Sequence, residues 1–213
     1  METKDLTPQQ RANLKYIALS HPWGTPVKNH ENRQHFKSTK AKLSQLQKKI
    51  MDSALPANFR DALAVTRSLG IKYLWIDSLC VLQKEGDNEG DDQGDFIEEA
   101  PFMQDIYSSA YCVIAASSAD GMWTGFLNER GERSVVRLPV DRHDPEANSH
   151  YYISEVVDDF QRDVIDSPLS RRGWVLQERA LARRTIYFTN NQTYFECGHS
   201  IRCETLSKLK RSG

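Results

Sequence analysis

The chain has little cysteine, almost no net charge and no long apolar run. Its cysteines, Cys80, Cys112, Cys197 and Cys203, are sparse and unevenly spaced, which argues against a disulfide framework. The formal net charge of −1 gives no reason to expect binding to nucleic acid. No apolar run is long enough to span a bilayer, and Met1–Lys15 lacks the apolar core of a signal peptide. We therefore expect a cytoplasmic protein with no membrane span and no nucleic-acid partner.

The rest of the composition is typical of one folded domain. With 213 residues, 39% of them hydrophobic, the chain is long enough to form a single core. We take 1–213 as one domain, with its core at about 14–206 and an insertion at 119–166. Residues 85–99 contain eight acids and neither lysine nor arginine. This composition predicts a solvated acidic loop over about 84–99.

Patterns typical of strands and helices alternate along the chain. Short apolar runs predict strands at 16–20, 73–77, 111–116 and 185–189. Apolar residues at helical spacing predict helices at 37–50, 59–69 and 96–110, the last turning Phe102, Met103, Ile106 and Tyr107 inward. The alternation predicts an α/β domain with a mostly parallel sheet flanked by helices. The run at 73–77 is apolar on both faces, so we expect it to be buried on both sides.

The residues that follow three of these strands are polar, small or aromatic. They are Ser20, His21, Trp23 and Gly24 after the first strand, Asp77 after the second, and Ser117 and Ser118 after the third. In sheets of this kind, ligands bind where the carboxyl ends of the strands open into loops. These residues therefore predict a binding site at one edge of the sheet.

A helical pattern near the end of the chain places a lone acid, Glu178, one turn beyond Trp174. Ser167 suits the N-cap and Pro168 the first helical position, so we expect the helix to begin there. Residues four apart lie on the same helix face, so Trp174 and Glu178 should point the same way. A flat aromatic ring beside one acid can form the wall of a site for a nucleotide and its sugar. The structural alternative is a core tryptophan beside a surface glutamate that a neighbouring arginine neutralises.

Other candidate residues also have structural alternatives. Asp77 can hydrogen-bond a ribose or cap the turn that follows it. His21 can contact a ligand or hold its loop in place. Cys197, His199 and Cys203 lie close enough in sequence to suggest a metal, but a second ligand pair at zinc-finger spacing is missing. We therefore predict no metal site.

Several blocks of sequence, in order, resemble the heterokaryon incompatibility (HET) domain of fungi. The first is Tyr-Ile-Ala-Leu-Ser-His-Pro-Trp-Gly at 16–24, and the others lie at 55–62, 69–80, 103–110, 168–181, 194–197 and 203–204. The blocks are spread from about residue 16 to 204, which is nearly the whole length of the chain. The resemblance implies a role in fungal non-self recognition, in which the domain triggers growth arrest or cell death.

The HET domain is in turn similar to TIR domains, many of which cleave NAD⁺. That similarity implies a TIR-like (flavodoxin-like) sheet and identifies Glu178 with the catalytic glutamate of the TIR helix. It also implies self-association into active assemblies and an upstream sensor protein or domain. The chain departs from the TIR pattern because roughly fifty residues separate the third strand from the Trp174/Glu178 helix, where a short loop is expected.

Cleavage of the nicotinamide–ribose bond leaves a sugar with oxocarbenium character, which one nearby carboxylate can stabilise. Glu178 is the predicted catalytic residue. The predicted substrate-binding residues are Ser20, His21, Trp23, Gly24, Asp77, Ser117, Ser118, Arg171 and Trp174, with Arg171 and the neighbouring Arg172 placed to contact a phosphate. NAD⁺ is then the substrate, and no cofactor is expected. The alternative is a non-enzymatic TIR-like signalling and oligomerisation module.

Overall fold

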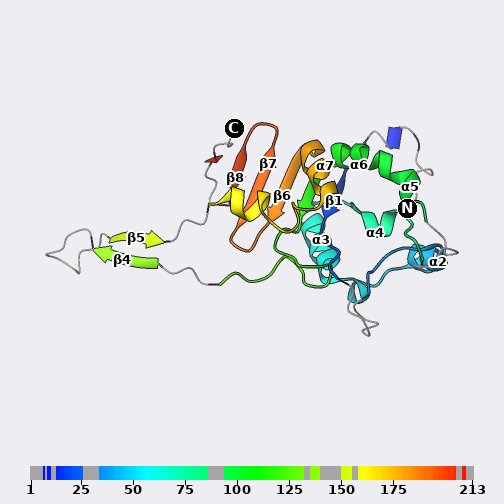
Figure 1. The fold of residues 1–213 in the computed structure, drawn as a ribbon, viewed down its shortest axis with the longest axis horizontal. Coiled ribbons are helices and arrows are strands. Elements are labelled where there is room, and N and C mark those ends of the chain that lie inside the picture. The colour runs from blue at the N-terminus through cyan, green and yellow to red at the C-terminus, as the bar shows by residue number, and fades with distance from the viewer. Residues whose placement is uncertain are drawn as a thin grey trace.

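A seven-stranded sheet with helices on both faces forms the body of the protein (Figure 1). The computed structural model describes residues 7, 9–10, 13–25, 34–85, 94–131, 135–139, 150–154, 158–204 and 208–209, without the side chains of 154, 174, 176, 177, 208 and 209. The main strands are β1 (Tyr16–Ser20), β2 (Tyr73–Ile76), β3 (Cys112–Ala115), β6 (Arg184–Phe188), β7 (Thr193–Cys197), β8 (Ile201–Cys203) and β9 (Lys208–Leu209). A separate two-stranded sheet contains β4 (Val135–Pro139) and β5 (His150–Ser154).

The helices differ widely in length. The α-helices are α2 (Lys40–Lys48), α3 (Ala57–Ser68), α4 (Asp77–Cys80), α5 (Phe96–Glu99), α6 (Met103–Ser109) and α7 (Gly173–Leu181). Short 3₁₀ turns form η3 (Asp52–Ala54) and η4 (Ala100–Phe102), and a π-helical turn forms η5 (Gln161–Ile165). No helix in the described ranges is both long and apolar enough to cross a membrane.

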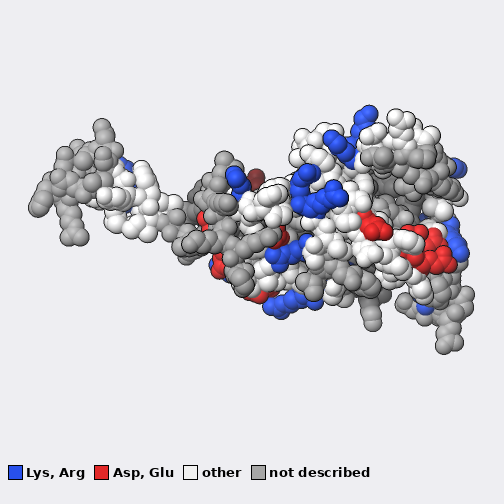
Figure 2. Space-filling model, turned by 90° about the horizontal axis from the view of Figure 1, so that it is seen from above, with Lys and Arg blue, Asp and Glu red and all other residues white. Residues whose placement is uncertain are grey.

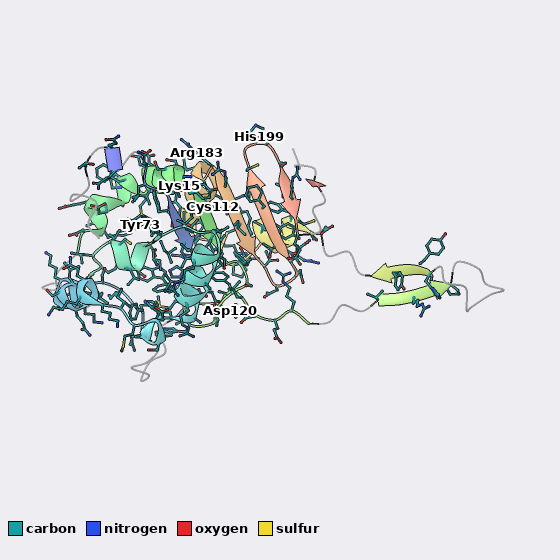
Figure 3. The ribbon with its side chains drawn as sticks, turned by 180° about the vertical axis from the view of Figure 1, so that it is seen from behind. Lys15, Tyr73, Cys112, Asp120, Arg183 and His199 are labelled. Carbon is teal, nitrogen blue, oxygen red and sulfur yellow. The ribbon has the colours of Figure 1, made fainter. Side chains whose placement is uncertain are left out.

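The strand order of the main sheet is β2-β1-β3-β6-β7-β8-β9, and its first four strands are parallel. The chain passes from β1 to β2 on one side and then crosses to β3 on the other. The carboxyl ends of these three strands therefore meet at one edge of the sheet. Figure 3 separates the two edges: Lys15 and Arg183, which precede β1 and β6, lie at one edge, and Asp120, which follows β3, lies at the other. The prediction of an α/β domain with a mostly parallel central sheet is confirmed.

The other side of the sheet is an antiparallel meander that the strand patterns did not predict. β6, β7, β8 and β9 follow one another in sequence, and each pairs with the next. The meander supplies the residues that hold α7 in place.

Alternate residues of β1 pack against helices on opposite faces of the sheet, as the two-residue period of a strand requires. Ile17 and Leu19 share a core cluster with Phe59 of α3. Ala18 faces the other way and lies in a cluster with Tyr107 of α6. Because β1 and β3 are covered on both faces, their residues are almost entirely buried.

Two predictions about these elements are wrong. The run at 73–77 is not buried on both faces, because β2 lies at the edge of the sheet and leaves Tyr73 exposed (Figure 3). The helix predicted at 96–110 is broken into α5, η4 and α6, since Pro101 has no N–H to continue the helical hydrogen bonds. Met103 and Tyr107 do turn inward and Ile106 is half-buried, but the break leaves Phe102 exposed.

The region predicted as an insertion, 119–166, has parts of different character. Its beginning belongs to the core: Met122 and Phe126 are buried, and Asp61 of α3 accepts hydrogen bonds from the backbone N–H groups of Phe126 and Leu127. The β4–β5 hairpin stands away from the body (Figures 1 and 3). Residues 86–93 of the predicted acidic loop lie outside the described residues, and Glu85 accepts a hydrogen bond from the backbone of α2.

Candidate functional site

Asp77 links the loop after β1 to the end of β2. Its Oδ2 accepts a hydrogen bond from the indole Nε1 of Trp23 at 3.1 Å, and its Oδ1 accepts one from the backbone N–H of Ser78 at 2.7 Å. The Nε2 atom of His21 lies 3.5 Å from Oδ1. The structure therefore brings two predicted site residues from the loop after β1, His21 and Trp23, against the carboxylate of a third, Asp77.

These contacts determine the charge of Asp77. Burial alone raises the pKa of its carboxyl, but His21, Ser78 and Trp23 stabilise the ionised form and bring the pKa below its ordinary value. His21 is buried, with its ring edge against Phe59. Its Nδ1 lies 3.0 Å from the carbonyl oxygen of Pro22, which can only accept, so Nδ1 carries a proton. Asp77 is thus an anion held in place by its own neighbours.

Glu178 lies on α7, at the α6 face of the sheet. Its Oε2 is buried and has no hydrogen-bond partner among the described residues, and the same holds for the hydroxyl of Ser20 at the end of β1. Burial raises the pKa of Glu178, and the negative charge of Asp77 adds to this. Ser20, Arg172 and the Tyr107 hydroxyl act in the opposite direction, but the net pKa stays above its ordinary value. Ser20 therefore lies close enough to affect Glu178 without the geometry of a hydrogen bond.

The raised pKa of Glu178 makes the stability depend on pH. This carboxyl ionises near 4.5 when unfolded and at a higher pH when folded, so the free energy of unfolding falls as pH rises through this window. Glu178→Gln removes the effect. We expect the variant to gain stability relative to the parent chain between pH 4 and pH 7, as measured by urea denaturation at both values. A difference between the two proteins that is independent of pH would contradict the prediction, and the exposed Glu129→Gln is the control.

Arg172, immediately before α7, connects this helix to the loop after β1. Its Nη1 donates a hydrogen bond of 2.6 Å to the carbonyl oxygen of His21, which is 151 residues away in the chain. Arg171, the other predicted phosphate contact, is exposed. The sequence placed two arginines side by side but could not show which of them faces inward. Tyr107 was predicted as a core residue, and its place beside Glu178 could not be inferred from its helical spacing.

The helix that carries Glu178 begins later than predicted. α7 starts at Gly173, and the Ser167 hydroxyl instead donates to the carbonyl of Val164 at 2.8 Å and accepts from the N–H of Ser170. The prediction that Ser167 is the N-cap is therefore wrong, because this serine closes an earlier turn. The side chain of Trp174 lies outside the described residues, so its pairing with Glu178 stays a prediction.

The residue next to Glu178 anchors α7 to the meander. Arg179 donates two hydrogen bonds to the carboxylate of Glu196 on β7, at 3.0 and 3.2 Å. The Tyr187 hydroxyl donates to the same carboxylate at 2.7 Å, and the guanidinium of Arg179 lies over the ring of Phe160. The position of Glu178 therefore depends on contacts that its neighbour makes with β7.

Gly24, Ser117 and Ser118 all lie at the predicted edge, and two of them make contacts within the chain. Gly24 has a φ of 76°, and a Cβ there would lie 2.8 Å from the Cα of Gly121. Ser118 donates its hydroxyl to the carbonyl of Phe126 at 3.4 Å. Ser117 is buried. Gly24 thus allows the loop after β1 to pack against the loop after β3, and Ser118 closes the loop after β3 on itself.

The close approach of the two loops predicts a large cost for a side chain at Gly24. Gly24→Ala is expected to lower the free energy of unfolding by more than Gly70→Ala, since Gly70 has a similar φ of 68° but nothing within 4 Å of the added methyl group. The control substitution should cost about 1–2 kcal/mol from its backbone conformation alone. Urea denaturation of both variants measures the difference. Equal losses would show that the loops separate at no cost.

No metal-binding cluster is found around Glu178 in the part of the chain that the structure describes. No group of three or more His, Cys, Asp and Glu side chains there is placed to hold a metal ion. An open cavity of about 400 Å³ lies elsewhere and is lined by Phe126, Leu127, Asn128, Arg130, Phe188 and Thr193. The groups that the structure brings together at the site are the carboxylates of Asp77 and Glu178, the hydroxyls of Ser20 and Tyr107, the imidazole of His21 and the guanidinium of Arg172.

Comparison with known proteins gives one match. The model of a family described as "Heterokaryon incompatibility protein (HET)" matches residues 16–178, from the first residue of β1 to Glu178. This match confirms the resemblance to the HET domain, although the blocks at 194–197 and 203–204 lie outside the matched residues. No curated protein and no solved structure matches the chain.

Proposed function

The chain belongs to the heterokaryon incompatibility family, and from this we propose that it is a TIR-like NAD⁺ glycohydrolase that triggers cell death in fungal non-self recognition. The observation that carries the proposal is the carboxylate of Glu178. One of its oxygens is buried without a hydrogen-bond partner among the described residues, close to the end of a central parallel strand. A buried acid with a shifted pKa at such a position is typical of a functional site.

The reaction needs a carboxylate and no proton donor for the leaving group. The nicotinamide ring of NAD⁺ is a cationic pyridinium that leaves as a neutral molecule, while positive charge develops on the ribose. The ionised form of Glu178 stabilises that charge and orients the attacking water. The approach of a positively charged ring favours this ionised form, which opposes the effect of burial on the pKa.

The neighbouring groups have separate roles in this proposal. The Ser20 hydroxyl, which has no hydrogen-bond partner among the described residues, binds a ribose hydroxyl or the attacking water beside Glu178. Arg172 keeps the start of α7 against the loop after β1 and provides positive charge near the phosphates. Asp77, His21 and Trp23 shape the edge of the site as a connected group.

The strand order supports a TIR-like arrangement. The order β2-β1-β3 is that of flavodoxin-like sheets, in which ligands bind at the point where the chain switches from one side of the first strand to the other. Ser20 lies at the end of β1, at this switch point. The antiparallel meander after β6 departs from an all-parallel sheet, so the likeness is restricted to the first four strands.

The test is to incubate the purified chain with NAD⁺ over a series of protein concentrations and to measure the products. We expect nicotinamide to be released together with ADP-ribose or its cyclic form, at a rate per molecule that rises with protein concentration. Absence of cleavage at every concentration, even when the chains are clustered through a fused oligomeric tag, would reject the proposal.

The second candidate is a non-enzymatic signalling and oligomerisation module. It is favoured by the apolar β4–β5 hairpin, which has a surface suited to contacts between proteins. In this reading Glu178 is a structural acid of the α6–α7 packing. The product assay separates the two candidates, because a module of this kind leaves NAD⁺ intact.

A further inference from the structure

The β4–β5 hairpin stands away from the body in all three views, and its described part is almost free of charge (Figures 1, 2 and 3). Its register places apolar residues opposite one another on one face. These pairs are Val136 with Ile153 and Leu138 with Tyr151. Side chains alternate between the two faces of a strand, so Arg137 and Tyr152 lie on the other face.

The hairpin leaves large apolar side chains in water. Tyr151 is 62% exposed and Tyr152 is 68% exposed, and Val136, Leu138 and Ile153 are exposed as well. A hairpin of two strands is only marginally stable by itself and needs a third strand or another packing surface. A contiguous apolar patch of this kind on a soluble protein marks an interaction surface.

The two outer edges of the hairpin differ in their ability to accept another strand. β4 contains Arg137 and ends in Pro139, and both a charge and a missing N–H discourage further pairing. β5, with the sequence His-Tyr-Tyr-Ile-Ser, contains no lysine, arginine or acid. Among the described residues, β5 pairs only with β4. Its outer edge is therefore the one that can accept a strand.

We propose that the hairpin is a self-association arm, in which β5 pairs antiparallel with β5 of a second copy of this chain. The five residues overlap fully when Tyr152 lies opposite Tyr152 of the second copy and Tyr151 lies opposite Ile153. Aromatic pairs and pairs of aromatic with β-branched residues are the stabilising ones across strands. The result is a four-stranded sheet, β4-β5-β5-β4, around a two-fold axis.

The composition of the strand favours a second copy over a different protein. An uncharged strand repels no identical strand, and full overlap gives matched pairs on both faces. The exposed side chains of the arm bury on the order of a few hundred Å² per chain, below the roughly 800 Å² per partner of a standard interface. The association is therefore weak and depends on concentration. The proposal of self-association rests on the structure of the arm alone, so it holds whether or not the chain cleaves NAD⁺.

The first test compares two lysine substitutions in the full chain by sedimentation velocity over a wide concentration range. Tyr152→Lys places two like charges opposite one another at the two-fold axis, and we expect it to weaken association by at least about tenfold. Ile97→Lys, at a 78% exposed position on α5, is the matched control and should associate like the parent chain. A parent chain that stays monomeric throughout, or a Tyr152→Lys variant that associates normally, would overturn the proposal.

The second test locates the axis by mild oxidation of single cysteine variants. Residue 152 faces its own copy, and opposed Cα atoms in antiparallel strands lie about 4.5–5.5 Å apart, within the range of a disulfide. Tyr152→Cys should therefore give a covalent dimer. Val135→Cys on β4 is separated from its copy by two intervening strands and should not, and the parent chain controls for the native cysteines. Equal cross-linking of the two variants would exclude this pairing.

Discussion

Glu178→Gln is expected to lower the rate of NAD⁺ cleavage by about a hundred- to a thousandfold while the protein stays folded. The loss follows from the role of the carboxylate: glutamine has the same shape but no charge to stabilise the developing cation on the ribose. The effect should fall on kcat more than on KM, because the charge appears on the sugar only as the bond breaks. Release of nicotinamide by the parent chain and the variant, at equal protein concentration, measures the loss.

Two controls separate this effect from general damage to the protein. Glu129→Gln removes an exposed acid outside the site and should leave the rate unchanged. Ser20→Ala removes a hydroxyl beside Glu178 and should give an intermediate loss, because the carboxylate stays in place. Full activity of folded Glu178→Gln would exclude Glu178 as the catalytic residue. Activity that disappears equally in Glu129→Gln would point to a folding defect.

The parallel strands could be predicted because each one is identified by the apolar residues of its own short segment. The runs at 16–20 and 112–115 are continuously apolar, as strands covered on both faces must be. The polar residues directly after them then lie at one edge through topology alone, since parallel strands end on the same side. The meeting of His21 and Asp77 follows from this rule without any knowledge of tertiary contacts.

The remainder of the site depends on contacts between distant segments, which have no signal in the local pattern. The hydrogen bond from Arg172 to the carbonyl of His21 requires α7 to pack over the end of β1. Tyr107 has the spacing of an ordinary core residue, and only the packing of α6 against α7 brings its hydroxyl to Glu178. The N-cap motif at Ser167 was also ambiguous, because the same hydroxyl can close a tight turn.

The contact that anchors α7 to β7, between Arg179 and Glu196, is the part of the site that was least predictable from the sequence. In the sequence, Arg179 is simply the residue after Glu178, and Glu196 lies in the block at 194–197 that resembles the HET domain. The structure joins the two across the α7–β7 packing and adds the Tyr187 hydroxyl to the same carboxylate. If alanine replaces Glu196, the positive charge of Arg179 stays partly buried but loses this carboxylate as its partner.

Glu196→Ala is therefore expected to lower the free energy of unfolding by about 2–3 kcal/mol, because it breaks a largely buried ion pair and removes the acceptor of a buried hydroxyl. The side chains of Arg179 and Glu196 are only 28% and 14% exposed. Arg130 and Glu204 form a comparable ion pair nearby that is 31% and 37% exposed, so Glu204→Ala should cost about 1 kcal/mol or less. Urea denaturation of the two variants compares the pairs directly.

The same two variants test whether the anchor also supports catalysis. At a temperature where both are folded, Glu196→Ala should cleave NAD⁺ more slowly than the parent chain, because α7 is free to shift and Glu178 moves with it. Glu204→Ala should keep the parent rate, since its ion pair holds β8 and the loop after β3 rather than α7. If Glu196→Ala loses stability but retains the full rate, the position of Glu178 is set by Tyr107 and Arg172 instead of by the meander.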